Sequence, residues 1–324
     1  MTSPKILKTA STAANYALHQ AADAVVFHGD CMRLINEIPD ESIPLAISSP
    51  PYSIGKDYEN TEDIDSFLDL HKRLLPQLVS KLQPGGSLCW QVGSHVKNGV
   101  VTPLDYLVMD CMRAMPEMKL RNRIVWTFGH GLHCSNRFSG RHETLLWFTK
   151  GDTYNFDLDA VRVKQKYPGK RYASGPKKGK LSGNPLGKNP GDVWDIPNVK
   201  ARHVEKTTHP CQFPVGLVHR LVRALSKPGD LVFDPFCGVS STGVAALALD
   251  RRFLGAEVMA EYIEIGRQRL KSALAGEAEF RPAEQEIFVP DPNSSVAREP
   301  DPIEWQEVVR IRTQPIQNQV RACA

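Results

Sequence analysis

A strand, a glycine-bearing loop, a helix and a second strand follow one another between residues 231 and 258. This run constrains the fold more than any other feature of the chain. The apolar stretch 231–233 ends at Asp234, the loop contains Gly238, and the small residues 244–249 predict a helix. The next strand, 252–258, carries Glu257, which lies 23 positions after Asp234. Parallel strands joined in this way hold ligands at their carboxyl edge. The run therefore predicts an α/β sheet with a nucleotide-type site, in which Glu257 grips a ribose.

A second motif, Ser-Pro-Pro-Tyr at residues 49–52, follows the apolar run 43–47. Its two prolines remove two backbone donors and hold the turn extended, so the carbonyl of Pro50 points away from the sheet. The Ser49 hydroxyl, this carbonyl and the Tyr52 ring suit a planar group that bears an exocyclic amine. Taken alone, the motif also fits a strand-ending turn in any α/β protein.

Together the two motifs resemble those of the DNA amino-methyltransferases. In that family an Asp/Asn/Ser-Pro-Pro-Tyr motif is catalytic, and a loop similar to Asp-Pro-Phe-x-Gly-x-Gly-Thr binds S-adenosylmethionine. Ser240 stands where the second glycine of the loop is commonest. The catalytic motif precedes the cofactor loop, which is the order of the permuted group called beta. The resemblance covers about residues 23–275.

Further positions agree with this resemblance. The family has an acidic residue near the adenine of the cofactor, and the sequence at 29–30 resembles it. It also has an Arg/His-Glu block on a strand, which residues 141–148 resemble. Residues 208–214 resemble the family's segment that lines the methionine end of the cofactor. The resemblance implies four catalytic residues: Ser49, Pro50, Pro51 and Tyr52. For the cofactor it implies Asp30, His209, Phe213, Asp234, Pro235, Phe236, Gly238, Ser240, Thr242 and Glu257.

The hydrophobic pattern predicts seven strands, at 24–29, 45–48, 86–92, 123–128, 143–149, 230–234 and 253–258. Helices are predicted at 64–82, 104–115, 213–225 and 260–274. With the resemblance, this predicts a doubly wound, mostly parallel, seven-stranded Rossmann-like methyltransferase sheet with an inserted target-recognition region. The predicted organisation is an N-terminal extension (1–22), a catalytic half (23–151), a target-recognition insertion (152–205), a cofactor-binding half (206–276) and a C-terminal tail (277–324), in which 303–311 can form one short element.

Between residues 161 and 191 the chain carries basic side chains and no acidic one. Glycines and prolines interrupt any helix there, so a solvated loop is one interpretation. A long acid-free loop inside a compact domain is uncommon unless it has a function, and the resemblance places target recognition in this interval. Basic side chains on such a loop contact phosphates of double-stranded DNA. The predicted DNA-binding residues are Lys56, Lys164, Lys166, Lys170, Arg171, Lys177, Lys178 and Lys180.

The resemblance implies methyl transfer to the exocyclic amine of a base flipped out of the duplex. Hydrogen bonds from the amine to Ser49 Oγ and to the Pro50 carbonyl would aim the nitrogen lone pair at the methyl group, and direct displacement follows. A leading serine in this motif usually accompanies N4-cytosine methylation in the family, whereas a leading aspartate accompanies N6-adenine methylation. The predicted target is therefore cytosine N4, with adenine N6 as the alternative.

Other interpretations are weaker. A C5-cytosine enzyme needs a Pro-Cys nucleophile downstream of the cofactor loop, and Pro210-Cys211 lies upstream of it. His130, His133 and Cys134 lack a fourth metal ligand nearby, so no metal is predicted. RNA or protein amide methyltransferases usually have a leading asparagine and the unpermuted order. A catalytically inactive DNA-binding regulator is the alternative from a different class, and both intact motifs argue against it.

Composition bears on where in the cell this protein is expected. The net charge is only +4, and no stretch approaches the apolar length of a membrane span. The first 22 residues lack the apolar core of a signal peptide. Seven scattered cysteines without a C-x-x-C pair indicate reduced thiols. We therefore expect a cytoplasmic protein without membrane contact. The resemblance implies a restriction endonuclease as a candidate partner, and both a monomer and a homodimer are compatible with it.

Overall fold

Nine strands form one sheet in the part of the computed structural model that is described here, residues 3–52, 64–129, 131, 133–167, 169–200, 203–284 and 291. Only β8 is antiparallel to its neighbours in this sheet, and every other pairing is parallel. The order across the sheet is β1 (Lys5–Leu7), β2 (Ala24–His28), β11 (Arg252–Glu257), β10 (Leu231–Asp234), β3 (Ile43–Ser48), β4 (Leu82–Val92), β8 (His142–Lys150), β7 (Met118–Thr127) and β9 (Val193–Asp195).

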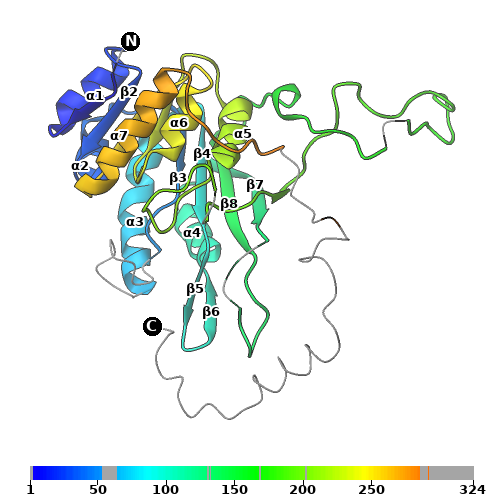
Figure 1. Cartoon of the computed structure of the whole chain (residues 1–324), viewed down its shortest axis with the longest axis horizontal. Helices are drawn as coiled ribbons and strands as arrows, with labels where there is room; N and C mark the ends of the chain where they lie inside the picture. The colour runs from blue at the N-terminus through cyan, green and yellow to red at the C-terminus, as the bar shows by residue number, and fades with distance from the viewer. Residues whose placement is uncertain are drawn as a thin grey trace. The chain divides into compact units, whose positions relative to one another are not determined.

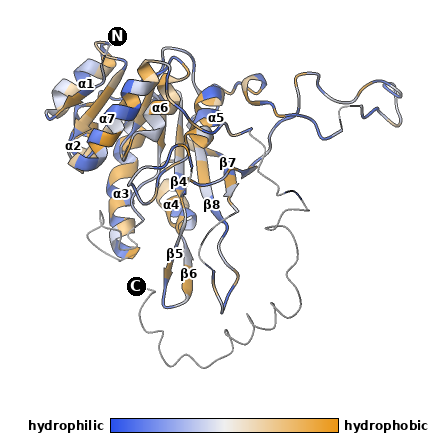
Figure 2. Ribbon diagram, in the orientation of Figure 1, coloured by the Kyte–Doolittle hydropathy of each residue, from blue (hydrophilic) through white to orange (hydrophobic). Residues whose placement is uncertain are grey.

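Helices cover both faces of the sheet, because successive side chains of each strand point to opposite faces. Val25 and Phe27 belong to one buried cluster, and Ala24 and Val26 belong to the other. The first cluster contains residues of α1 (Ala10–Leu18), α2 (Cys31–Glu37), α3 (Ile64–Lys81) and α4 (Leu104–Met112), and the second contains residues of α5 (Val215–Leu225), α6 (Ser241–Leu247) and α7 (Ala260–Leu274). Figures 1 and 2 show this arrangement, with the central strands largely hydrophobic.

All seven predicted strands are present, although β7 begins five residues earlier than predicted. The prediction of seven strands was too low, because β1 and β9 add an edge strand on each side. Each has three residues, too few for an alternating pattern to be visible. A separate hairpin joins β5 (Ser94–Lys97) to β6 (Val100–Pro103), and a 3-10 turn spans Asp159–Val161.

Residues 1–22, predicted as an N-terminal extension, contain a strand and a helix. β1 pairs in parallel with β2, and α1 buries four alanines in the first core cluster: Ala10, Ala13, Ala14 and Ala17. An alanine face carries little hydrophobic contrast, so the amphipathic pattern of this helix is weak in the sequence. Residues 5–18 therefore belong to the sheet and its covering layer.

The two sequence motifs meet because β3 and β10 are neighbours. Val232 pairs with Leu45, and Phe233 pairs with Ala46. From β10 the chain passes through α6 to β11, whereas from β3 it passes through α3 to β4, on the other side of the pair. A reversal of this kind opens a crevice at the carboxyl ends of the two strands, where ligands bind in open α/β sheets.

Two segments leave this core. Residues 161–191 form a loop that extends away from the sheet in Figure 1, with isolated bridges at Val163–Lys188 and Arg171–Leu181. The first residues after α7 fold back on α5, where the rings of Phe280 and His219 lie 5.3 Å apart. The short element predicted at 303–311 lies outside the described residues. Within the described ranges, no helix is both long and apolar enough to cross a bilayer.

Candidate active site

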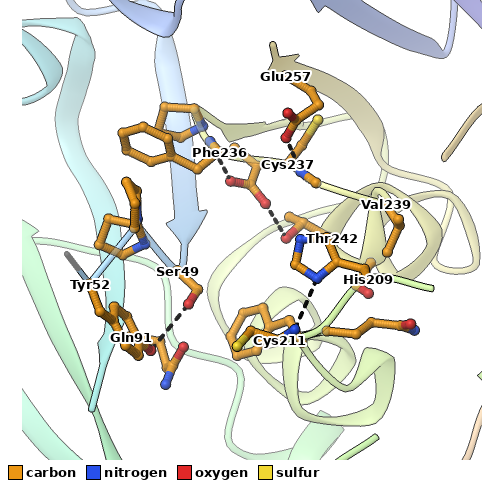
Figure 3. A pocket seen from close by; sticks show the side chains of 18 of the residues that line it. Ser49, Tyr52, Gln91, His209, Cys211, Phe236, Cys237, Val239, Thr242 and Glu257 are labelled. Atoms are coloured by element: carbon orange, nitrogen blue, oxygen red, sulfur yellow. Dashed lines mark hydrogen bonds between the residues drawn. The ribbon is translucent and has the colours of Figure 1, made fainter. Parts of the chain in front are cut away.

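A cavity of about 520 Å³ opens at the carboxyl edge of the sheet, beyond the ends of β2, β3, β10 and β11. Figure 3 shows Ser49, Tyr52 and Gln91 on one side of it and the loop after β10 on the other. All four predicted catalytic residues line it. So do nine of the ten predicted cofactor residues: Asp30, His209, Phe213, Asp234, Pro235, Phe236, Gly238, Thr242 and Glu257.

Asp234 connects the two motifs. Its Oδ1 accepts hydrogen bonds from Ser48 Oγ (2.6 Å) and from the Phe236 backbone N–H (3.0 Å), and its Oδ2 accepts one from Thr242 Oγ1 (2.6 Å). The side chain is only 3% exposed. Burial raises the pKa of this carboxyl to about 6, although the three hydrogen bonds act in the opposite direction. Asp234 therefore holds the loop, the start of α6 and the end of β3 together.

The loop after Asp234 has a backbone that few residues adopt. Ser240 has φ 60° and ψ 38°, in the left-handed region that favours glycine. Its buried hydroxyl faces Cys237 Sγ and does not line the cavity, so its prediction as a cofactor-binding residue needs correction. Gly238 has φ 49°, and a Cβ there would lie 3.2 Å from His209 Nε2. Glycine at this position keeps the floor of the cavity open.

Two carboxylates lie at the ends of β2 and β11. Glu257 accepts hydrogen bonds from the backbone N–H groups of Gly238 (3.1 Å), Val258 (2.8 Å) and Met259 (2.7 Å). Burial raises the pKa of the Glu257 carboxyl, and these N–H groups oppose the rise. Asp30 is exposed and caps α2 by accepting from the Met32 N–H at 2.7 Å. Both acids therefore have backbone partners that fix their orientation.

His209 lies between the cofactor loop and α7. Its Nδ1 accepts a hydrogen bond from the Cys211 N–H at 3.2 Å, and its ring lies 4.5 Å from that of Tyr262. Burial, together with the charges of Lys206 and Arg269, lowers the pKa of His209 to about 4. The ring is therefore neutral at physiological pH, and its Nε2 carries the proton on the side toward Gly238.

On the other side of the cavity, the Ser49 hydroxyl lies 3.2 Å from the Tyr52 hydroxyl. Tyr52 in turn donates to Glu143 Oε2 at 3.5 Å, and Gln91 Nε2 donates to the same oxygen. Burial raises the pKa of Glu143 to about 7, while the hydrogen bonds from Gln91 and Tyr52 lower it. Burial also raises the pKa of Tyr52 well above its usual value, so its phenol stays protonated.

Sequence reasoning missed part of the lining. Trp126 and Phe128 come from β7, and the Trp126 ring lies 5.2 Å from Phe128 and 6.3 Å from Phe213. Gln91 ends the apolar run of β4 next to the catalytic strand. A polar residue at the carboxyl end of a buried strand is a signal that could have identified it. The aromatic residues carry no such signal, because nothing in the local pattern distinguishes them from core residues.

The predicted DNA-binding residues that fall within the described ranges do not line the cavity. Arg171 and six lysines are exposed on the loop after β8: Lys164, Lys166, Lys170, Lys177, Lys178 and Lys180. Lys56 lies outside the described residues, as does His130 of the weighed metal cluster. Within the described part of the chain, no three His, Cys, Asp or Glu side chains are grouped to hold a metal ion.

The lining of the cavity fits S-adenosylmethionine. The floor of the cavity is open at Gly238, acids stand at two strand ends, and aromatic rings form a wall. Its volume lies within the range usual for cofactor sites, about 300–1,000 Å³. An amine placed beside Ser49 and Pro50 would face the cofactor loop across the same space.

Comparisons with known proteins agree with this geometry. The model of the N6/N4 DNA methylase family matches residues 43–268. Type II methyltransferase M.BglII of Bacillus subtilis is 44% identical over 76% of this chain and 68% of its own length. M.ScaI of Streptomyces caespitosus is 34% identical over 78% and 83%, and the DNA adenine methyltransferase YhdJ of Escherichia coli K12 is 31% identical over 76% and 83%.

Solved structures share the fold. A Thermus thermophilus protein assigned as a DNA modification methylase, solved in complex with S-adenosyl-L-methionine, superposes with a TM-score of 0.56 at 26% identity, over 78% of this chain and 94% of its own. The cytosine-N4-specific PvuII DNA methyltransferase superposes with a TM-score of 0.62 over 87% and 97%, and its 20% identity speaks for the fold alone. The family model, these relatives and the joined motifs identify this chain as a member of the N6/N4 DNA methylase family, a DNA methyltransferase.

Proposed function

We propose that this chain transfers a methyl group from S-adenosylmethionine to the N4 amine of a cytosine flipped out of double-stranded DNA. The observation that carries the proposal is the position of Ser49. Its neutral hydroxyl lines the same cavity as the cofactor loop, and the Ser48–Asp234–Thr242 hydrogen bonds connect the two motifs. Amine and methyl donor can therefore meet in one enclosed space.

Glu257, Asp30 and Gly238 hold the adenosyl part of the cofactor in this proposal. Glu257 binds the two ribose hydroxyls, since its carboxylate lines the cavity and is oriented by three backbone N–H groups. Asp30 stands near the adenine, and His209 and Phe213 line the methionine end. Asp234 acts through the loop it braces, because its three acceptor contacts are already made within the protein.

Ser49 and Pro50 hold the target amine. Its two protons bond to Ser49 Oγ and to the Pro50 carbonyl, which directs the nitrogen lone pair away from the ring plane. S-adenosylmethionine supplies an electrophilic methyl group on a sulfonium. The Tyr52 ring offers a stacking surface, which offsets the unstacking of the flipped base by roughly 1–3 kcal/mol.

The loop within 152–205 contacts the DNA in this proposal. Its lysines and Arg171 are exposed, and the stretch 161–191 carries no acidic side chain that would repel phosphates. Phosphate contacts position a protein on the duplex, and base contacts specify the sequence. A partner restriction endonuclease and a monomeric or homodimeric state stay predictions from the sequence.

The choice of cytosine over adenine rests on Ser49. A neutral hydroxyl suffices to orient the cytosine amine, whereas an aspartate would give the adenine amine a stronger, charged acceptor. A relative named as a DNA adenine methyltransferase is among the similar proteins, so adenine N6 is the competing target.

Mass spectrometry of nucleosides from DNA of cells that express the protein tests this choice. We expect N4-methylcytosine, which should disappear in cells that express Ser49→Ala. N6-methyladenine without N4-methylcytosine would overturn the choice of base. Calorimetry with S-adenosylmethionine tests the different-class alternative, because an inactive DNA-binding regulator would bind no cofactor.

A further inference from the structure

The established reaction leaves one proton to be removed. When the amine nitrogen bonds to the methyl carbon and the carbon–sulfur bond breaks, sulfur keeps the electron pair. The nitrogen then carries one proton too many. Ser49 Oγ accepts a hydrogen bond from this amine in the proposed function, so it is the first protein atom that the proton can reach.

The hydroxyl groups beyond Ser49 form a chain with a defined direction. Tyr52 has a single proton, which it donates to Glu143 Oε2 at 3.5 Å. The 3.2 Å contact between Ser49 and Tyr52 must therefore use the proton of Ser49. The lone pairs of Ser49 Oγ are then available to the amine. Each hydroxyl donates away from the substrate and toward Glu143.

Glu143 suits the far end of this chain. It lines the cavity and is half-buried, and the Gln91 amide donates to the same carboxylate oxygen. A Cβ on Gly93 would lie 3.2 Å from the Tyr52 ring and 3.3 Å from Glu143 Oε1, so glycine leaves room for both side chains. The Tyr52–Glu143 contact is long, and catalytic hydrogen bonds commonly shorten when substrate binds.

We propose that the amine proton leaves through a relay of Ser49, Tyr52 and Glu143, with the Glu143 carboxylate as the final acceptor. Ser49 Oγ takes the proton and gives its own to the Tyr52 oxygen, and Tyr52 gives its own to Glu143. One N–H bond is broken and one carboxyl O–H bond is formed, so the step needs no other reactant. Because Glu143 is partly exposed in the cavity, it can release the proton to solvent between turnovers. The relay rests on the proposed function, but it serves the amine of either base.

The surroundings of Glu143 support this role. Among the described residues, Tyr52 is the ionisable group that hydrogen-bonds to Glu143. Gln91 on β4 and Trp126, which pairs with Glu143 from β7, are neutral. A negative charge on the Cys211 sulfur would raise the pKa of Tyr52. Burial raises the pKa of Glu143 to about 7, so the carboxylate is a base matched to neutral pH.

Single-turnover methylation between pH 5.5 and pH 9 tests the relay. In the wild-type protein we expect the rate to rise about tenfold per pH unit below about pH 7 and then to level off. Glu143→Gln should lose this rise and react about tenfold or more slowly at pH 8. Tyr52→Phe keeps the ring and removes only the hydroxyl, and it should show the same loss. The double variant should be no slower than either single one.

Controls separate the relay from a structural role. Glu41→Gln makes the same chemical change before the amino end of β3 and should keep the wild-type pH profile. Both relay variants should bind S-adenosylmethionine within twofold of wild type by calorimetry. Carbon-13 NMR of glutamate carboxyls in the ligand-free protein should show one group titrating near pH 7. This signal should be absent in Glu143→Gln and titrate higher in Tyr52→Phe, since the tyrosine hydrogen bond lowers that pKa.

A pH profile that survives in either variant, or the absence of a carboxyl that titrates near neutrality, would overturn the relay. Methylation of adenine in place of cytosine would overturn only the choice of base, because the same variants would be tested on the adenine amine.

Discussion

The buried carboxylate of Asp234 should make the protein less stable at high pH than it would be with a neutral group in the same place. Its pKa in the folded protein is about 6, compared with 3.8 for the free side chain. The folded state therefore binds this proton more tightly than the unfolded state does. The buried carboxylate therefore lowers the free energy of unfolding by its full amount above about pH 7. This destabilisation decreases as the pH falls from 6 toward 3.8.

Asp234→Asn removes this destabilisation and keeps the shape of the side chain. The asparagine Oδ1 can still accept from Ser48 and Phe236, and the hydroxyl of Thr242 can rotate to accept from Nδ2. A pKa difference of about 2 corresponds to about 3 kcal/mol at pH 8, and linkage leaves about half of it at pH 5. The variant should therefore gain more stability over wild type at pH 8 than at pH 5, by an amount on the order of 1 kcal/mol.

Urea denaturation of both proteins at the two pH values measures this difference. The comparison between pH values matters more than either value alone, because changes in hydrogen bonding contribute equally at both. Asp110→Asn removes an exposed carboxylate and should show no such pH dependence. If the stability change of Asp234→Asn were the same at pH 5 and pH 8, the carboxylate would not be destabilised by burial and the reasoning would fail.

Two further predictions concern binding. Glu257→Ala loses charge-assisted hydrogen bonds to the ribose, each worth roughly 1.5–3 kcal/mol. It should therefore weaken S-adenosylmethionine binding well over tenfold by calorimetry, whereas the control Glu264→Ala on α7 should not. Unchanged affinity in Glu257→Ala would mean that Glu257 does not bind the cofactor. Replacing Lys177, Lys178 and Lys180 together with alanine should lower the salt slope of DNA binding by roughly 0.9 per lost phosphate contact, with little change in sequence preference. A matched control removes three exposed lysines near the amino ends of strands: Lys5, Lys119 and Lys227. A slope equal to that of wild type would mean that the loop is only a solvated surface.

The sequence predicted the fold where strands are buried on both faces. Runs such as 24–27 and 231–233 are continuously apolar and are bounded by polar residues or turns. The helix α7 was predicted at its observed ends because its apolar residues recur with helical spacing. The sequence did not predict the edge strands β1 and β9. Each has only three residues and pairs with a single neighbouring strand, so it shows no hydrophobic periodicity.

Some residues of the candidate site could likewise be predicted from the sequence, and others could not. Asp234 and Glu257 end β10 and β11, and Ser49 directly follows β3, so local sequence predicted that they would lie at the carboxyl edge. Gln91 and Trp126 reach the cavity through the order of strands in the sheet, which no local pattern contains. Ser240 was predicted to bind the cofactor, but its side chain is buried in the core. Its backbone, in the left-handed conformation, shapes the loop.

The sequence by itself determined which chemical groups this protein has at the ends of its strands, and with them the family to which it belongs. Only the tertiary structure decided how those groups act on one another. Asp234 accepts from Ser48, 186 positions away, and Tyr52 contacts Glu143, 91 positions away. Burial, which raises the pKa of both carboxyls, is likewise a property of the packed state. The physical reason is that desolvation and hydrogen-bond partnership depend on neighbours in space, and these neighbours exist only once the sheet has assembled.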